Sequence, residues 1–216
     1  MRIGLLGGSF NPIHNAHLRI AGEAQEACRL ERVIFIPAAD PPHKPLAGDV
    51  SFENRSTMVR MAIEGRPDFE MSTIEAKRDG KSYSIDTIRI FRERFAGDDL
   101  FFIIGGDSFL EIGSWYRYAG IFRLCNLIVV KRPGCQIISP LEVLPDAVRG
   151  EFAFDDKTGC LTHESGTSVF FIAGSPLELS STEIRRLASA GADITRYVPP
   201  DVAAYISQQR IYHQCL

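Results

Sequence analysis

The chain has 216 residues, 45% of them hydrophobic, and its 24 Lys and Arg against 27 Asp and Glu give a formal net charge of -3. This slight acidic excess disfavours a nucleic-acid partner, and no apolar run reaches the roughly 20 residues that span a bilayer. The five cysteines are irregularly spaced, which argues against a disulfide framework or a zinc site and suits a reducing, cytoplasmic setting.

Apolar runs of strand length alternate with segments of helical periodicity along the chain. The runs are continuously hydrophobic, which is typical of parallel strands covered on both faces. We predict strands at Arg2–Leu6, Val33–Pro37, Phe69–Ile74, Leu100–Ile104, Asn126–Lys131 and Val169–Ala173. We predict helices at His17–Leu30, Asn54–Glu64, Ser84–Phe95 and Ser180–Ala190, and a last one that follows Pro199 and reaches about Gln209. The alternation predicts right-handed βαβ crossovers and an α/β, doubly wound parallel sheet.

One stretch interrupts this alternation, at about residues 133–166. It is rich in proline, glycine and acidic residues, with a short polar and apolar strip at Glu151–Phe154. We interpret it as an irregular insertion with one short helix, rather than as a domain boundary. The length of the chain supports one well-packed core, so we expect a single domain over residues 1–216.

A turn that suits anion binding directly follows the first strand. Gly7 and Gly8 permit a tight turn and a close approach of backbone amides to a ligand. A helix that begins near Asn15 would add free N–H groups and the positive end of its dipole. His14 and His17 are three residues apart, so both imidazoles should lie on one side of the first helical turn. We therefore expect a positive pocket at the carboxyl edge of the sheet, where open α/β sheets bind ligands.

Two separated segments resemble the signatures of the adenylyl- and cytidylyltransferase superfamily. Gly8–His17 is similar to the pattern GxFxPxHxGH, with Ala16 where glycine is usual. Leu179–Arg185 is similar to the pattern (I/L)SSTx(I/L)R, and it follows the last predicted strand as in that superfamily. The resemblance implies a Rossmann-like nucleotidyltransferase fold and an enzyme that transfers a nucleotidyl group with release of pyrophosphate.

Three further segments resemble the bacterial nicotinate-nucleotide adenylyltransferases. Pro41–Pro45 is similar to their PPHK loop, and Ser82–Thr87 to their S-Y-(S/T)-x-D-T helix start. Gly105–Phe109, with Trp115 and Lys131–Gly134, is similar to their GxDx(F/L)…W…RPG stretch. The resemblance implies that ATP and nicotinate mononucleotide are joined into nicotinate adenine dinucleotide, in NAD biosynthesis. It also implies Mg²⁺, bound through the substrate phosphates.

The resemblance assigns roles to individual side chains. The catalytic set is His14, His17, Lys44 and Arg185. The expected ATP site contains Gly7, Gly8, Ser9, Phe10, His14, His17, Ser181, Thr182 and Arg185. The expected site for nicotinate mononucleotide contains Asn11, His43, Lys44, Tyr83, Ser84, Asp107, Trp115 and Arg132. Because the acceptor phosphate is already ionised near neutral pH, no general base is needed, and catalysis should come from positioning and charge stabilisation.

Other interpretations stay open at this point. Ser181 and Thr182 could simply cap the helix that follows them, and Trp115 could be a core residue. For the whole chain, the alternatives are another member of the superfamily, such as a pantetheine-phosphate adenylyltransferase, or a nucleotide-binding regulatory module without catalysis. A homo-oligomer is also open.

Overall fold

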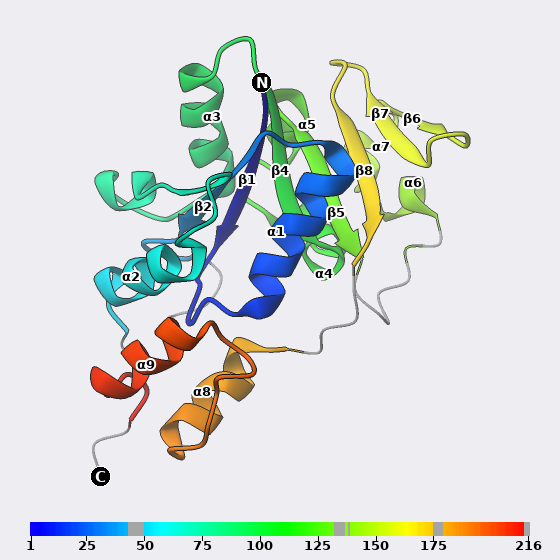
Figure 1. The fold of residues 1–216 in the computed structure, drawn as a ribbon. Coiled ribbons are helices and arrows are strands. Elements are labelled where there is room, and N and C mark those ends of the chain that lie inside the picture. Colours follow the sequence, from blue (N-terminus) through cyan, green and yellow to red (C-terminus); the bar gives the residue numbers. More distant parts are fainter. Residues whose placement is uncertain (43–49, 132–136, 138, 175–178, 214–216) are drawn as a thin grey trace. The chain divides into compact units, whose positions relative to one another are not determined.

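Helices pack against an eight-stranded, mostly parallel sheet (Figure 1). The computed structural model describes residues 1–42, 50–131, 137, 139–174 and 179–213. The strands are β1 (Arg2–Gly8), β2 (Arg32–Pro37), β3 (Phe69–Met71), β4 (Asp99–Gly105), β5 (Asn126–Lys131), β6 (Phe152–Asp155), β7 (Cys160–His163) and β8 (Ser168–Ala173). The helices are α1 (Asn15–Cys28), α2 (Phe52–Ile63), α3 (Ser84–Arg94), α4 (Gly106–Leu110), α5 (Ala119–Leu124), α6 (Pro140–Val143), α7 (Asp146–Arg149), α8 (Ser181–Ser189) and α9 (Pro200–Gln208), with 3₁₀-helices η1 (Ile74–Lys77) and η2 (Ile112–Ser114).

The strand order of the sheet is β3-β2-β1-β4-β5-β8-β7-β6. Its first six places follow the 3-2-1-4-5-6 order of a doubly wound sheet, with β8 as the sixth strand. β1, β4, β5 and β8 pair in parallel, so the predicted α/β fold with a parallel sheet is confirmed. The order reverses between β1 and β4, and sheets of this kind bind ligands outside the carboxyl ends of the strands at such a reversal. Gly7 and Gly105 lie at this edge.

The central strands form the core because they are apolar on both faces. Leu127, Ile128, Val129 and Val130 of β5 are each at most 1% exposed. Burying a side chain of this kind contributes about 1.5–3 kcal/mol, so a continuous apolar run is stable only where both faces of the sheet are covered. The predicted strand at Phe69–Ile74 is shorter than expected, because the chain enters η1 at Ile74.

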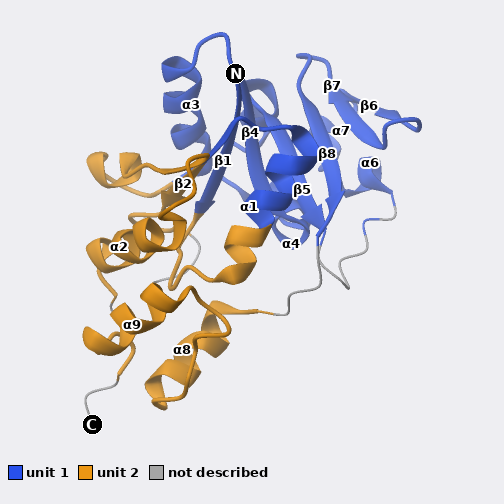
Figure 2. Ribbon diagram, viewed as in Figure 1, with its two compact units in different colours: residues 1–7, 20–33, 83–176 blue, residues 8–19, 34–82, 177–216 orange. Residues whose placement is uncertain are grey.

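The chain divides into two compact units (Figure 2). The first comprises residues 1–7, 20–33 and 83–176, and it contains β4, β5, β8 and the α3–α5 helices. The second comprises residues 8–19, 34–82 and 177–216, and it contains the turn after β1 together with α2, α8 and α9. The single domain predicted over residues 1–216 stays a prediction.

The stretch at residues 133–166 is more regular than the sequence indicates. Its described part holds two four-residue helices, α6 and α7, and two antiparallel strands, β6 and β7. β7 pairs with β8 antiparallel, so the hairpin extends the parallel sheet at that edge. The short strands carry little hydrophobic periodicity, which is why the sequence did not predict them.

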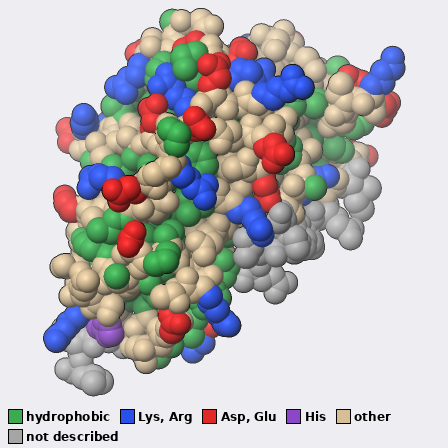
Figure 3. Space-filling view, viewed as in Figure 1, with side chains coloured by type: hydrophobic (Ala, Val, Ile, Leu, Met, Phe, Trp, Pro, Cys, Tyr) green, Lys and Arg blue, Asp and Glu red, His purple; other side chains and the backbone are tan. Residues whose placement is uncertain are grey.

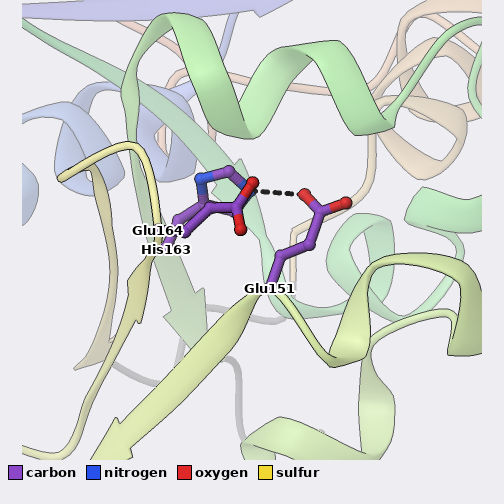
Figure 4. A group of neighbouring side chains, drawn as sticks. All are labelled: Glu151, His163 and Glu164. Atoms are coloured by element: carbon purple, nitrogen blue, oxygen red, sulfur yellow. Dashed lines mark hydrogen bonds and ion pairs between the residues drawn. The ribbon is translucent and has the colours of Figure 1, made fainter.

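A buried histidine joins the two ends of this hairpin (Figure 4). His163, at the end of β7, is 2% exposed, and its Nε2 lies 2.8 Å from the carboxylate of Glu151, which precedes β6. The backbone N–H of Ser165 donates to Nδ1 of His163, so a neutral ring carries its proton on Nε2 and donates it to Glu151. Arg123 of α5 binds both Glu151 and Glu164, at 3.0 and 3.2 Å. These residue types could hold a metal ion, but Arg123 and His163 already satisfy the carboxylates, so we interpret the cluster as structural.

The same contacts predict that the contribution of Glu151 to the stability of the fold is lost in acid. The hydrogen bond from His163, followed by the nearby Arg123, lowers the pKa of Glu151 from its ordinary value of 4.5. A carboxylate with a lowered folded pKa stabilises the fold above its unfolded pKa, and this contribution is lost as the pH falls through the folded value. Glu151→Gln should therefore lower the melting temperature near neutral pH and by less in acid below 4.5. Glu142→Gln, at an exposed glutamate of the same stretch, is the control, and equal shifts at both pH values would contradict this prediction.

Candidate functional site

The turn between β1 and α1 combines exposed and buried residues. Gly7 and Ser9 are exposed, whereas Phe10 is 1% exposed. Phe10 has a φ of 45° and folds back, so a Cβ at Gly8 would lie 3.2 Å from its ring. Glycine at position 8 therefore gives Phe10 the space to fill the core beneath the turn. The peptide between Asn11 and Pro12 is cis.

The two histidines of the turn stack on each other, which agrees with the predicted placement of both imidazoles on one side of the first helical turn. The ring centroids of His14 and His17 are 3.7 Å apart, at an interplanar angle of 22°. The backbone N–H of His14 donates to Nδ1 of His17 at 3.2 Å. A neutral His17 therefore has its proton on Nε2, where it is a hydrogen-bond donor of the kind that a phosphate oxygen accepts. The rings of Phe10 and His17 are nearly perpendicular, with centroids 5.1 Å apart, and this contact helps to hold His17 in its orientation.

The start of α1 offers fewer free amides than we predicted. The helix begins at Asn15, as expected. However, the N–H of Asn15 donates to the carbonyl of Tyr197 at 2.9 Å, and the N–H of His17 donates to the carbonyl of His14 at 2.9 Å. Anion binding by this helix would therefore depend on its dipole and on its side chains more than on those two amides.

The second signature segment contacts the first, within the second unit. Ser180 caps α8, because its hydroxyl accepts the N–H of Glu183 at 3.2 Å, so capping is not the role of Ser181 or Thr182. Arg185 donates through Nη1 to the carbonyl of Asn11 at 2.8 Å and through Nη2 to the hydroxyl of Thr182 at 3.1 Å. The hydroxyl of Ser181 lies 3.4 Å from the carbonyl of Pro12, to which it donates. The two segments are thus joined by side-chain donors on backbone carbonyls.

The chain near its C-terminus also holds this turn. The hydroxyl of Tyr212 donates to Oδ1 of Asn11 at 2.7 Å, and both residues are buried. Burial raises the pKa of Tyr212, which keeps the phenol protonated as the donor. No sequence pattern pointed to Tyr212. Since Oδ1 of Asn11 is engaged inside the protein, its expected contact with nicotinate mononucleotide stays a prediction.

The residues expected to bind the acceptor gather partly in the first unit. The ring of Tyr83, which precedes α3, lies against Tyr116 with centroids 4.4 Å apart. Trp115 meets Phe102 edge-on, with centroids 6.2 Å apart. Tyr116 is 43% exposed, and sequence reasoning gave it no role although it adjoins Trp115.

A second glycine places a carboxylate at the end of β4. A Cβ at Gly105 would collide with Oδ1 of Asp107, so glycine lets this carboxylate fold over the strand end. Asp107 is exposed, at the strand end where the sequence predicts it. Three expected site residues, His43, Lys44 and Arg132, lie outside the described residues.

One face of the molecule carries charge of mixed sign, and the described helices are too short or too polar to cross a membrane. On the face drawn in Figure 3, Lys and Arg are interspersed with Asp and Glu. Within the ranges that the structure describes, no helix is both long and apolar enough to cross a membrane.

Known proteins resemble this chain over its whole length. Residues 5–187 match the family model described as cytidylyltransferase-like. A probable nicotinate-nucleotide adenylyltransferase of Pelobacter propionicus is 60% identical over 215 residues, which is 100% of both chains. One of Geobacter metallireducens is 53% identical over 98% of both chains. The solved structure of a Plasmodium falciparum nicotinic acid mononucleotide adenylyltransferase complexed with NaAD has a TM-score of 0.75, at 19% identity, and covers 98% of this chain and 97% of its own.

Proposed function

This chain belongs to the cytidylyltransferase-like family and, within it, to the nicotinate-nucleotide adenylyltransferases, and we propose that it joins MgATP and nicotinate mononucleotide. The products are nicotinate adenine dinucleotide and pyrophosphate. One observation carries the proposal: Arg185 of the second signature segment reaches the carbonyl of Asn11 in the first, next to the stacked His14 and His17. The guanidinium thus contacts the turn that leads to the two imidazoles, and Gly7 and Ser9 of that turn are exposed to solvent.

The reaction needs positioning and charge stabilisation rather than a base. An oxygen of the acceptor phosphate forms a bond to the α-phosphorus of ATP, while the bond from that phosphorus to the oxygen bridging to the β-phosphorus breaks. The electron pair leaves with pyrophosphate, and no proton has to be removed from the nucleophile. In this proposal Nε2–H of His17 and the guanidinium of Arg185 meet the negative charge that develops on the phosphate oxygens.

Magnesium fits as part of the nucleotide substrate. Among the described residues, His14, His17, Arg185, Ser181 and Thr182 bring imidazole, guanidinium and hydroxyl groups to the turn, which suit phosphate oxygens rather than a Mg²⁺ ion. The ion would therefore be held mainly by ATP and water, and when bound it would neutralise charge on the triphosphate. His14 and His17 at the turn, together with Arg185 on α8, would hold the nucleotide itself.

Selection of the nicotinate carboxylate is proposed for the start of α3. This helix has 11 residues, and the carbonyl of Tyr83 accepts the N–H groups of Asp86 and Thr87. The preceding amides of Ser84 and Ile85 have no acceptor within the helix, and helix starts favour negative charge. An amide of nicotinamide would present a donor to these donors. Tyr83, Tyr116 and Trp115 offer aromatic faces for the pyridine ring.

A cytoplasmic location belongs to the same proposal. Cys28, Cys125 and Cys160 are free thiols, and burial raises the pKa of Cys125 to about 12. Such unpaired cysteines are common in a reducing compartment, where a disulfide would not persist.

The function is tested by supplying MgATP with one acceptor at a time and measuring pyrophosphate release. Nicotinate mononucleotide should be used about 100-fold or more faster, in kcat/KM, than nicotinamide mononucleotide, because a site of donors rejects an amide strongly. Pantetheine phosphate should give no release. Equal use of the two mononucleotides would contradict the role of the α3 amides. Pyrophosphate release with pantetheine phosphate alone would mean that pantetheine phosphate, not nicotinate mononucleotide, is the acceptor. ATP binding without release of pyrophosphate from any acceptor would favour a nucleotide-binding regulatory module.

A further inference from the structure

A fully buried arginine contacts the turn that leads to His14 and His17. Arg55, on the first turn of α2, has an exposed fraction of 0%. Its Nη1 donates to the carbonyl of Ser9 at 2.7 Å. Among the residues that the structure describes, Nε and Nη2 of Arg55 have no hydrogen-bond partner. A guanidinium with five N–H donors is thus held in the interior largely for one backbone contact.

This burial is unfavourable for stability. Removing a guanidinium from water is costly unless its donors are satisfied, and within the described part of the chain Nε and Nη2 of Arg55 are not. The same burial lowers the pKa of Arg55 from 12.5, although nearby Tyr212, Glu53 and Glu75 oppose this. The closest aromatic ring of α2, that of Phe52, is 5.6 Å from the guanidinium carbon. A residue that weakens the fold points to a use in function.

The position of Arg55 is fixed from two sides. The hydroxyl of Ser51 accepts the N–H of Asn54 at 3.1 Å and so caps α2 one turn before Arg55. The hydroxyl of Tyr205, on α9, donates to Oδ1 of Asn54 at 2.9 Å. These two hydrogen bonds fix the first turn of α2, and so they fix the position of the Arg55 guanidinium. A residue that positions a functional group needs such a rigid base.

We propose that Arg55 is a positioning residue for the nucleotide-binding turn, acting on the carbonyl of Ser9. In a trans peptide the C=O and the N–H point in opposite directions, so holding the Ser9 carbonyl towards α2 turns the N–H of Phe10 away from it. The N–H of Phe10 is then oriented as a donor for a phosphate oxygen, and the buried positive charge of Arg55 adds to the attraction for a triphosphate. The proposal rests on the proposed function in one respect, which is that the anion is that of ATP. Arg55 does not touch the reacting atoms.

Three variants test this role in the full chain. Arg55→Met keeps a side chain of similar volume and removes the N–H donors. Arg55→Lys keeps the positive charge but lacks the planar, forked arrangement of guanidinium donors. Arg60→Met, at an exposed arginine of the same helix, is the matched control. Melting temperature, MgATP affinity by calorimetry, and kcat and KM for each substrate are measured for all three.

The proposal expects a loss of nucleotide binding without a loss of stability. Arg55→Met should melt at or above the wild-type temperature, bind MgATP about 10-fold or more weakly, and keep KM for the acceptor within about two-fold. Arg55→Lys should fall between it and the wild type, and Arg60→Met should match the wild type. A lower melting temperature with normal MgATP affinity, or equal losses for both substrates, would overturn the proposal. If Arg55→Met does not fold, the melting temperature and the MgATP affinity of Arg55→Lys are compared with those of the wild type instead.

The calorimetry separates this inference from the proposed function. If the wild type does not use nicotinate mononucleotide, the proposed function fails, yet the ratio of MgATP affinities between wild type and variants still decides the role of Arg55. If the wild type is active and the ratio is close to one, the positioning role alone is rejected.

Discussion

Replacing His17 with alanine should reduce kcat by about 100- to 1,000-fold while the protein stays folded, because one preorganised donor at the phosphates is lost. His17 is half-buried on the first turn of α1, and its Nδ1 accepts the N–H of His14, so a neutral ring carries its proton on Nε2. An interaction made chiefly in the transition state affects kcat more than KM. Pyrophosphate release gives both constants, and a thermal melt checks the fold.

Two further variants make this prediction specific. His17→Gln keeps an N–H donor and should recover part of the loss. His213→Ala removes an exposed histidine outside the turn and should leave turnover unchanged. Turnover of His17→Ala within about two-fold of the wild type would remove His17 from the catalytic set.

Replacing Arg185 with methionine should lower kcat/KM for ATP by about 100-fold, since charge at the triphosphate and the tie to the turn are lost together. Arg185 donates to the carbonyl of Asn11 and to the hydroxyl of Thr182, and both contacts disappear. Arg185→Lys should restore little, because an ammonium does not reproduce the fork of a guanidinium.

The neighbouring arginine is the natural control for this second prediction. Arg186 lies on the same helix and pairs with Glu183 at 2.6 Å, on a largely exposed surface. Exposed pairs of this kind contribute about 0–1 kcal/mol, so Arg186→Met should leave kcat/KM near the wild-type value. Equal losses in the two variants, measured by initial rates at varied ATP, would mean that α8 matters only as a structural element.

The parallel core could be predicted because its strands are long and continuously apolar. Asn126–Lys131 is bounded in the structure as the sequence predicts, and β4 extends one residue beyond the predicted range at each end. The hairpin of β6 and β7 could not be predicted, because strands of four residues with exposed positions such as Phe154 lack a periodic signal. The contact between His163 and Glu151, like the pairing of β7 with β8, joins positions that are separated along the chain.

Some residues of the candidate site could likewise be predicted from the sequence, and others could not. His14, His17 and Arg185 belong to recognisable patterns, and the structure joins these patterns through the carbonyl of Asn11. Tyr212 lies in no pattern, and its contact with Asn11 arises only from the folded chain. Arg55 had a signal that was overlooked: its spacing to Val59 and Ala62 places a charged residue on the apolar face of a helix. A charged residue on a buried helix face is rare, which makes it a candidate for a functional role.

The most direct test follows the α-phosphate of ATP. The protein is incubated with nicotinate mononucleotide, Mg²⁺ and ATP labelled at its α-phosphate, and the products are separated. The account predicts that the label leaving ATP appears in nicotinate adenine dinucleotide, with unlabelled pyrophosphate released in equal amount. Label recovered as AMP, or a mononucleotide carrying a phosphate from the γ-position, would contradict adenylyl transfer as the reaction of this chain.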